Sequence, residues 1–167
     1  MIKTYSFPSV YESTLREFST SNDPILGFSK LKFDGANYLV GLQALNEGVS
    51  PHKSINAAPG DVDYKVITQS ALLLASNALK NESKNGKVPK MVVTSGFPYA
   101  TYQFNKDEAV EYYKEEKIIT YYKADDNGSL SSEQRVVSVA SANVIPELVG
   151  CDIAVRKGDQ PVEGNFI

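Results

Sequence analysis

Apolar positions along the chain change between the spacing of strands and the spacing of helices. The longest helical pattern runs from Asp61 to Asn81, where apolar residues recur every three or four positions after an aspartate start signal. Its apolar arc is wide, so we expect this helix to be packed deeply. A shorter, half-exposed helix is predicted over Asn105 to Lys117, with Asn105 and Glu108 as a capping box.

Short runs rich in β-branched and aromatic residues predict the strands. They cover Ile2 to Val10, Phe28 to Phe33, Tyr38 to Leu45, Lys90 to Thr94, Ile118 to Ala124 and Arg135 to Ile145. Turn-forming residues at Asp34 to Asn37 and at Asp125 to Gly128 predict a hairpin in each of the two places. Polar segments at Ser13 to Asp23 and at Glu47 to Gly60 predict loops. The run at Lys90 to Thr94 is typical of a buried parallel strand that leads to an edge loop.

The stretch from Arg135 to Val155 joins a predicted strand to the start of a helix. Pro146 and Glu147 follow the strand directly. Proline is tolerated at the first helical position, and a carboxylate beside it is favoured by the helix dipole. We therefore expect Glu147 at the carboxyl end of a strand, where open α/β sheets bind their ligands.

Length and composition indicate one ordinary core. The chain has 167 residues, of which 42% are hydrophobic and 22% charged. We predict a single domain over residues 1–167, in which 28–60 form a hairpin and loop excursion and 61–167 supply the core helices and strands. A net charge of -3 gives no uniform attraction to nucleic acid or acidic membranes, although a local basic patch could exist. Without a signal peptide or a long apolar run, we expect a soluble, cytoplasmic protein that contacts neither nucleic acid nor membrane directly.

Few residues offer redox or metal chemistry. Cys151, the single cysteine, cannot form an internal disulfide and is interpreted as a buried, inert thiol. His52, the single histidine, is interpreted as a solvated surface residue. An acidic run could look like a metal site, but interleaved lysines indicate a solvated helix face. That run contains Asp107, Glu108, Glu111, Glu115 and Glu116, with lysines at Lys106, Lys114 and Lys117. The tyrosines between Tyr99 and Tyr122 could form an interaction surface or simply cover the sheet edge.

Several motifs occur together in an order that resembles a known family. They are YLVG at Tyr38 to Gly41, the helix from Asp61 to Asn81, MVVTSGFPYATY at Met91 to Tyr102, the charged helix, and ANVIPELVG at Ala142 to Gly150. This order is similar to that of the first domain of bacterial and archaeal actin-like ATPases, most closely the plasmid-segregation type (ParM/StbA-like). The resemblance implies an α/β, actin-like (RNase H-like) domain I fragment with a mixed sheet flanked by helices. It also implies ATP-dependent polymerisation into cytoskeletal filaments that segregate plasmid or phage DNA through an adaptor protein.

The sequence departs from this family at the phosphate-binding loops. The family holds nucleotide phosphates with two hairpin loops of the Asp-x-Gly type, and neither is present here. Phe7 to Val10 resembles the segment after the first loop, and Asn165 to Ile167 resembles the start of a strand leading into the second. The sequence also lacks GxGxxG, GxxxxGK[ST] and DxGxxT motifs. The turn predicted at Thr94-Ser95-Gly96 is interpreted as a turn at the edge of the sheet and not as a phosphate-binding site.

These departures qualify the expected biochemistry. ATP and magnesium are implied for the complete family protein, whereas we expect this chain alone to bind ATP weakly or not at all and to be inactive by itself. A sheet without its opening hairpin exposes backbone donors and acceptors, so we also expect self-association, as a filament or a strand-swapped dimer. A filament contact through Tyr112 and Tyr113 is one hypothesis.

The carboxylate of Glu147 has two possible roles. The resemblance implies a latent catalytic role, in which its carboxylate orients or deprotonates the water that attacks the γ-phosphate. The alternative is a first-turn glutamate that only favours the helix dipole, worth roughly 0.3 to 1 kcal/mol.

Two other functional classes stay open. The chain could be a non-catalytic interaction protein that docks on an actin-like filament. It could also be an unrelated small α/β binding module, which would be favoured if the strands at Lys90 to Thr94 and Val136 to Ile145 lay in different sheets.

Overall fold

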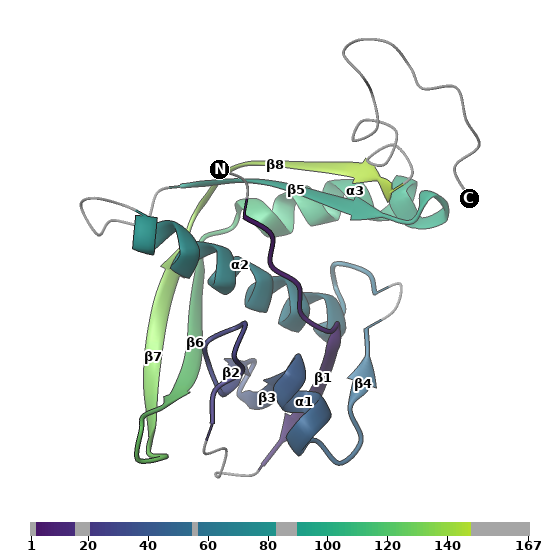
Figure 1. Cartoon of the computed structure of the whole chain (residues 1–167). Coiled ribbons are helices and arrows are strands. Elements are labelled where there is room, and N and C mark those ends of the chain that lie inside the picture. Colours follow the sequence, from purple (N-terminus) through teal and green to yellow (C-terminus); the bar gives the residue numbers. More distant parts are fainter. Residues whose placement is uncertain (1–2, 16–20, 55–56, 83–89, 148–167) are drawn as a thin grey trace.

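The computed structural model describes residues 3–15, 21–54, 57–82 and 90–147. The elements in chain order are β1 (Val10–Thr14), β2 (Lys30–Phe33), β3 (Ala36–Val40), α1 (Leu42–Glu47), β4 (His52–Lys53), α2 (Val62–Glu82), β5 (Met91–Phe97), α3 (Tyr99–Lys114), β6 (Lys117–Ala124), β7 (Leu130–Val137) and β8 (Val139–Pro146). The fold is α/β, as predicted, with both parallel and antiparallel strand pairs and helices packed against them (Figure 1).

An antiparallel sheet of six strands, in the order β4-β1-β3-β2-β6-β7, forms the larger part of the structure. Both predicted hairpins are present in it. β2 and β3 are joined by Asp34 and Gly35, whose φ values of 48° and 78° are those of a type I′ turn. β6 and β7 pair over their whole lengths around the turn at Asp125 to Ser129. The first hairpin therefore lies in the middle of the sheet and supplies much of its core.

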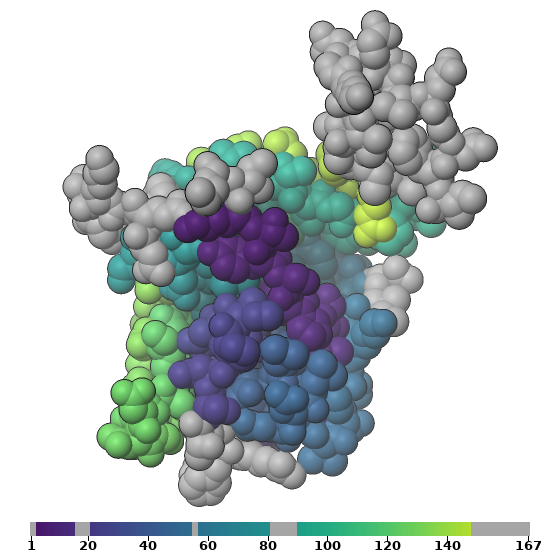
Figure 2. All heavy atoms as spheres, viewed as in Figure 1, coloured from purple at the N-terminus to yellow at the C-terminus, as the bar shows by residue number. Residues whose placement is uncertain are grey.

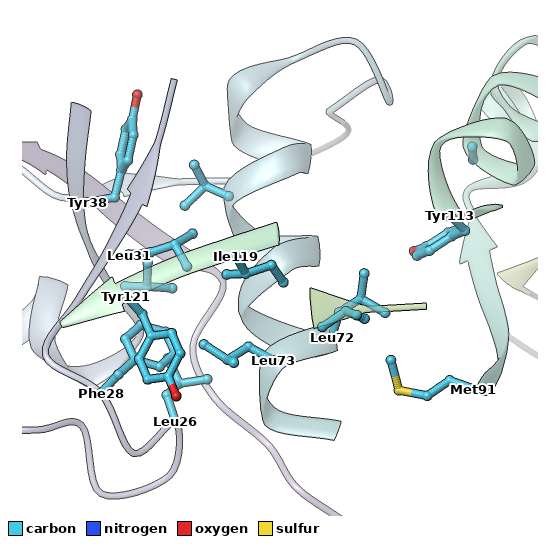
Figure 3. Packing of buried hydrophobic residues seen from close by; sticks show 14 of the residues in the cluster. Leu26, Phe28, Leu31, Tyr38, Leu72, Leu73, Met91, Tyr113, Ile119 and Tyr121 are labelled. Carbon is cyan, nitrogen blue, oxygen red and sulfur yellow. The ribbon is translucent and has the colours of Figure 1, made fainter. Parts of the chain in front are cut away.

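Helix α2 packs deeply, as its wide apolar arc predicts. It contacts β1, β2, β3 and β7 of the six-stranded sheet, and Asp61 precedes it as expected. The Asp61 carboxylate accepts a hydrogen bond from the backbone N–H of Ala58, which fixes the entry to the helix. Figure 3 shows Leu73 directed toward Tyr121, and its neighbour Leu72 directed toward Met91. The helix is therefore buried on more than one side.

The N-terminal strand lies later in the chain than predicted. Residues 3–8 form no strand, and β1 begins at Val10 and continues into the segment predicted as a loop. Pro8 has no N–H to donate to a strand ladder, which explains why pairing starts after it. The side chain of Glu12 then accepts hydrogen bonds from the backbone N–H groups of Val49 and Ser50, which holds β1 beside the loop before β4.

Two further boundaries differ from those predicted. The apolar run from Tyr38 to Leu45 divides into β3 and the short helix α1, which starts after Gly41. Helix α3 begins at Tyr99, so Asn105 lies inside it and does not form a capping box. Pro98 occupies the position before the first helical residue, where its missing N–H costs nothing.

The strand predicted over Arg135 to Ile145 belongs to two sheets. Its first part is the end of β7 in the six-stranded sheet, and its second part is β8, which pairs in parallel with β5. Only Ser138 separates the two strands, and its carbonyl accepts a hydrogen bond from the N–H of Met91. One extended segment thus links the large sheet to the β5–β8 pair.

Candidate functional site at the carboxyl ends of β5 and β8

Parallel pairing brings the ends of β5 and β8 to one edge. In the register of the pair, Gly96 lies opposite Ile145 and Phe97 lies opposite Pro146. Helix α3 follows β5 at this edge, and Glu147 follows β8 with helical backbone conformation. Glu147 therefore lies at the carboxyl end of a parallel strand, as predicted, although Pro146 is the last residue of the strand and not the first of a helix.

Glu147 and Gly96 are in close contact at this edge. A Cβ atom added to Gly96 would lie 3.3 Å from Cγ of Glu147 and 3.8 Å from the carbonyl oxygen of Ile145. Glycine therefore leaves room for the glutamate side chain, which is exposed to solvent. Gly96 itself lies in β5, so the turn predicted at Thr94-Ser95-Gly96 is part of the strand. The carboxylate has space to receive a ligand or a water molecule.

An aromatic cluster anchors the end of β5. Phe97, at 4% exposure, stacks on Tyr64 of α2, with ring centroids 5.6 Å apart and an angle of 15°. The Tyr64 hydroxyl donates a hydrogen bond of 3.1 Å to the Tyr113 hydroxyl, and Gln69 donates one of 3.2 Å to the Tyr112 hydroxyl. The rings of Tyr112 and Tyr113 are in edge contact. These contacts join α2 and α3 to the last residue of β5, at the end of the β5–β8 pair where Glu147 lies.

The cluster predicts a loss of stability at alkaline pH. Burial raises the pKa of Tyr112 to about 12, and burial followed by the hydrogen bond with Tyr113 raises the pKa of Tyr64. The unfolded chain ionises its tyrosines near pH 10. The folded state favours the neutral phenol. The buried tyrosines therefore contribute fully to the free energy of unfolding below about pH 10, and this contribution is lost as the pH rises toward 12.

Urea unfolding between pH 8 and 12 checks this expectation. Tyr112→Phe should show a smaller decline of the free energy of unfolding over this range, because the buried group can no longer ionise. Tyr99→Phe is the matched control, since Tyr99 is 70% exposed and should leave the decline unchanged. An equal decline in the Tyr112→Phe protein and the unmodified protein would contradict the assignment.

In the part of the chain that the structure describes, this edge supplies a carboxylate but not a phosphate cradle. The glycines with positive φ in the described ranges lie away from this edge: Gly27 in the loop before β2, Gly35 and Gly128 in the two hairpin turns, and Gly41 before α1. Within residues 3–15, 21–54, 57–82 and 90–147, no group of three or more His, Cys, Asp or Glu side chains could hold a metal ion. The described residues thus place one exposed carboxylate, that of Glu147, at this edge, whereas the phosphates and metal of a nucleotide would need further groups.

A cavity of about 640 Å³ lies between β8 and α3, near this edge. Its polar lining includes Thr94, Asn143, Lys106 and Asp107. The Nζ atom of Lys106 lies 5.7 Å from the centroid of the Tyr102 ring, and Tyr102 also lines the cavity. Glu147 is not part of this lining, so the carboxylate and the cavity are neighbouring features and not one site.

The remaining sequence candidates fall into different places. His52 is exposed in β4, as predicted, with its ring 5.9 Å from that of Tyr11. Lys117 is not part of a solvated helix face, because it lies in β6 with a side chain only 8% exposed. Its ammonium group donates hydrogen bonds to the carbonyl oxygens of Tyr112 and Glu115, and burial lowers its pKa. Cys151 and the strand expected at Asn165 to Ile167 lie outside the described residues.

The tyrosine run serves mainly as packing. Tyr113 and Tyr121 are buried, and Tyr112 is partly buried, whereas Tyr99 is exposed. A filament contact through Tyr113 is therefore wrong as a surface hypothesis, because a partner cannot reach a side chain that is 6% exposed. Replacing Tyr113 would disturb the core before it disturbed an interface.

Comparison with known proteins bears on the fold and the family. None of the helices in the described ranges is long and apolar enough to cross a membrane. Comparisons with curated proteins and with solved structures give no match. A family model described as the N-terminal domain of actin-like proteins matches residues 2–150. Of the two strands predicted at Lys90 to Thr94 and Val136 to Ile145, β5 and β8 share one sheet, whereas Val136 and Val137 belong to β7 of the six-stranded sheet, so the criterion against an unrelated module is met only in part. The chain therefore belongs to the actin-like proteins and carries their N-terminal domain.

Proposed function

We propose that this chain is part of an actin-like, ATP-dependent protein of the ParM/StbA type that forms filaments and segregates plasmid or phage DNA. The observation that carries the proposal is an exposed carboxylate, Glu147, at the carboxyl ends of two parallel strands in an actin-like N-terminal domain. In phosphoryl transfer the protein's main tasks are positioning and electrostatic stabilisation, and orienting the attacking water is a task for one side chain. Glu147 is suited to that task.

ATP and magnesium are the proposed cofactors. Glu147 fits the task of orienting water, but the described residues do not by themselves fit a triphosphate, because the β5–β8 edge has no turn of glycines that would present several N–H groups. We therefore propose that groups beyond these residues hold the phosphates. The proposed partners are further copies of the protein in a filament and a segregation adaptor that links the filament to DNA.

The test is polymerisation coupled to hydrolysis in the longest polypeptide that contains residues 1–167. Adding magnesium and ATP should raise light scattering and the sedimented fraction, and phosphate should be released on the same time scale. Omitting magnesium should abolish both signals. Scattering and sedimentation that do not change on addition of ATP would overturn the proposal.

A second function is favoured by the described residues, which place no phosphate cradle at the β5–β8 edge. A chain that lacks this cradle could act as a non-catalytic protein that docks on an actin-like filament. Sedimentation with preformed filaments separates the two functions. The docking function predicts that the chain sediments with filaments while the rate of phosphate release stays that of the filaments alone.

A further inference from the structure

A cavity of about 460 Å³ lies between the C-terminal half of α2, the loop before β2 and the strands β6 and β7. Figure 2 shows the segment before β2, in indigo, beside the green strands β6 and β7 and below the purple N-terminal segment. A cavity of this volume is of the size that holds a small molecule. Glu147 does not line it, so the cavity is separate from the carboxylate at the β5–β8 edge.

The strand β7 directs charged side chains to the inner face of the six-stranded sheet. The register of the hairpin places Arg135 opposite Ile119, which is 0% exposed. It places Glu133 opposite Tyr121, which is 2% exposed. Residues directly opposite one another share a face, so both charges lie on the side of the core, whereas the apolar Val136 lies on the other side and is 52% exposed. This is the reverse of the usual pattern of a half-buried strand, in which apolar residues face inward.

Two lysines from other elements line the same cavity as these charges. Lys80 comes from the last turn of α2, and Lys123 comes from β6, two positions after Tyr121 and therefore on the same face. The lining thus contains three cationic side chains and one carboxylate, that of Glu133. The carbonyl end of α2 adds only a partial negative charge. The cavity therefore carries a net positive charge.

The positive charges are not neutralised within the described ranges. No carboxylate there forms an ion pair with Lys80, Lys123 or Arg135. The carboxylate of Glu133 instead accepts a hydrogen bond of 2.6 Å from the Tyr121 hydroxyl. The Nε atom of Arg135 is buried and has no acceptor among the described residues. Buried donors are nearly always hydrogen-bonded, so this guanidinium has unused capacity to bind an acceptor.

Protection of a sheet edge explains only part of this arrangement. Within the described ranges β7 is an edge strand, and an inward-pointing charge on such a strand hinders pairing with another sheet. That role needs a single charge on β7. It does not explain why lysines of α2 and β6 face the same cavity.

The chemistry of the lining favours a phosphate group. A guanidinium forms paired hydrogen bonds with phosphate oxygens, and lysines add point charges around them. A phosphate dianion offsets an excess of cations better than a carboxylate with its single charge. The cavity also has apolar lining from Ile25, Leu26, Leu74 and Ala78, which gives space for a carbon skeleton beside the phosphate.

We propose that this cavity binds a phosphate group, held by Arg135, Lys80 and Lys123. The volume and the apolar lining suit a small phosphate ester, and the same side chains would also hold free phosphate. The proposal does not rest on ATP hydrolysis at Glu147, and it stands or fails separately from that function.

Titration of the whole chain with ribose 5-phosphate and with inorganic phosphate tests the proposal. At about pH 8 and constant ionic strength both probes are mostly dianions. At least one should bind with a dissociation constant below about 1 mM and shift the amide NMR signals of Lys123 and Arg135. Tighter binding of ribose 5-phosphate identifies an ester as the ligand, and equal affinity identifies free phosphate; both results support the site. Ribose and sodium chloride should shift neither signal.

Variants that remove one charge each provide the matched comparison. Arg135→Gln should weaken binding at least about tenfold, and Arg135→Lys should fall between it and the unmodified protein, because lysine keeps the charge but not the paired donors. Lys123→Gln should weaken binding several-fold and does not disturb the buried Tyr121 hydroxyl. Lys114→Gln removes the same charge from an exposed position of α3 outside the cavity and should bind like the unmodified protein. Circular dichroism confirms that the variants are folded.

Three outcomes would overturn the proposal. The first is that neither probe shifts the signals of Lys123 and Arg135 at about 10 mM. The second is binding that Lys114→Gln weakens as much as Lys123→Gln does, since the anion would then respond only to the overall charge. The third is an Arg135→Gln protein that self-associates in sedimentation equilibrium while its affinity for both probes is unchanged, because the inward charge would then serve only to protect the edge of the sheet.

Discussion

Replacing Asp23 with alanine is expected to lower the free energy of unfolding by about 3 to 5 kcal/mol. The side chain is 1% exposed, and its carboxylate accepts three backbone hydrogen bonds. Two come from Ile25 and Leu26, at 2.8 Å each, and the third comes from Leu42 at 2.9 Å. Alanine would leave these donors without an acceptor in a largely buried place, which costs about 1 to 3 kcal/mol for each fully buried group.

The position of Asp23 makes the effect larger than that of a local turn. The loop that it closes carries Leu26 and Phe28 into the core, and both are 1% exposed. Through Leu42 the same carboxylate fixes the start of α1. Loss of the side chain therefore loosens two segments that are distant in sequence, in addition to leaving polar groups unsatisfied.

Urea unfolding followed by circular dichroism measures the change. Asp23→Asn keeps one acceptor oxygen and should fall between the alanine variant and the unmodified protein. Asp126→Ala is the control, because Asp126 is exposed in the β6–β7 turn and surface changes of this kind usually stay within about 0.5 kcal/mol. An Asp23→Ala protein as stable as the Asp126→Ala protein would show that the three hydrogen bonds contribute little.

Asp23 also illustrates what the sequence could not reveal. It ends a polar, serine-rich stretch that predicts a loop, and a loop aspartate is normally solvated. Its burial follows from contacts with Leu42, which lies 19 positions away. Lys117 is similar, because interleaved charges predict a solvated face and only the turn from α3 into β6 brings its ammonium group to two carbonyl oxygens. Buried polar residues that are satisfied by distant backbone leave no local pattern.

Elements with local signals were predictable. The Asp34-Gly35 pair specifies its hairpin through backbone conformations that few residues adopt, and the apolar spacing of α2 specifies its burial. The position of Glu147 at the end of a strand follows from the β-branched run before it, whereas the prediction that Pro146 opens a helix is wrong, because Pro146 is the last residue of β8. The division of the predicted Arg135 to Ile145 strand between two sheets was not predictable, since a continuous β-branched run has the same pattern whichever partners its two halves find.

Under the proposed function, replacing Glu147 with glutamine should lower the rate of ATP hydrolysis by about 10² to 10⁴-fold, the usual contribution of a positioned acid or base. Glutamine has nearly the same shape but cannot accept a proton, so nucleotide binding and the fold should be unchanged. Phosphate release under single-turnover conditions, in the longest polypeptide that contains residues 1–167, measures the chemical step separately from filament assembly. Glu111→Gln on the exposed side of α3 is the matched control.

The contact between Gly96 and Glu147 allows a second, independent test of the same carboxylate. Gly96→Ala brings a methyl group to 3.3 Å from Cγ of Glu147. The flexible Glu147 side chain can relieve this close contact by a small shift. Gly96→Val adds two branches at that point and should displace the carboxylate while leaving its charge intact. If Glu147 positions water, hydrolysis should fall in the order glycine, alanine, valine, with ATP affinity unchanged. If Glu147 only favours the helix dipole, the three proteins and Glu147→Gln should all hydrolyse ATP at the same rate, and the catalytic assignment would be wrong.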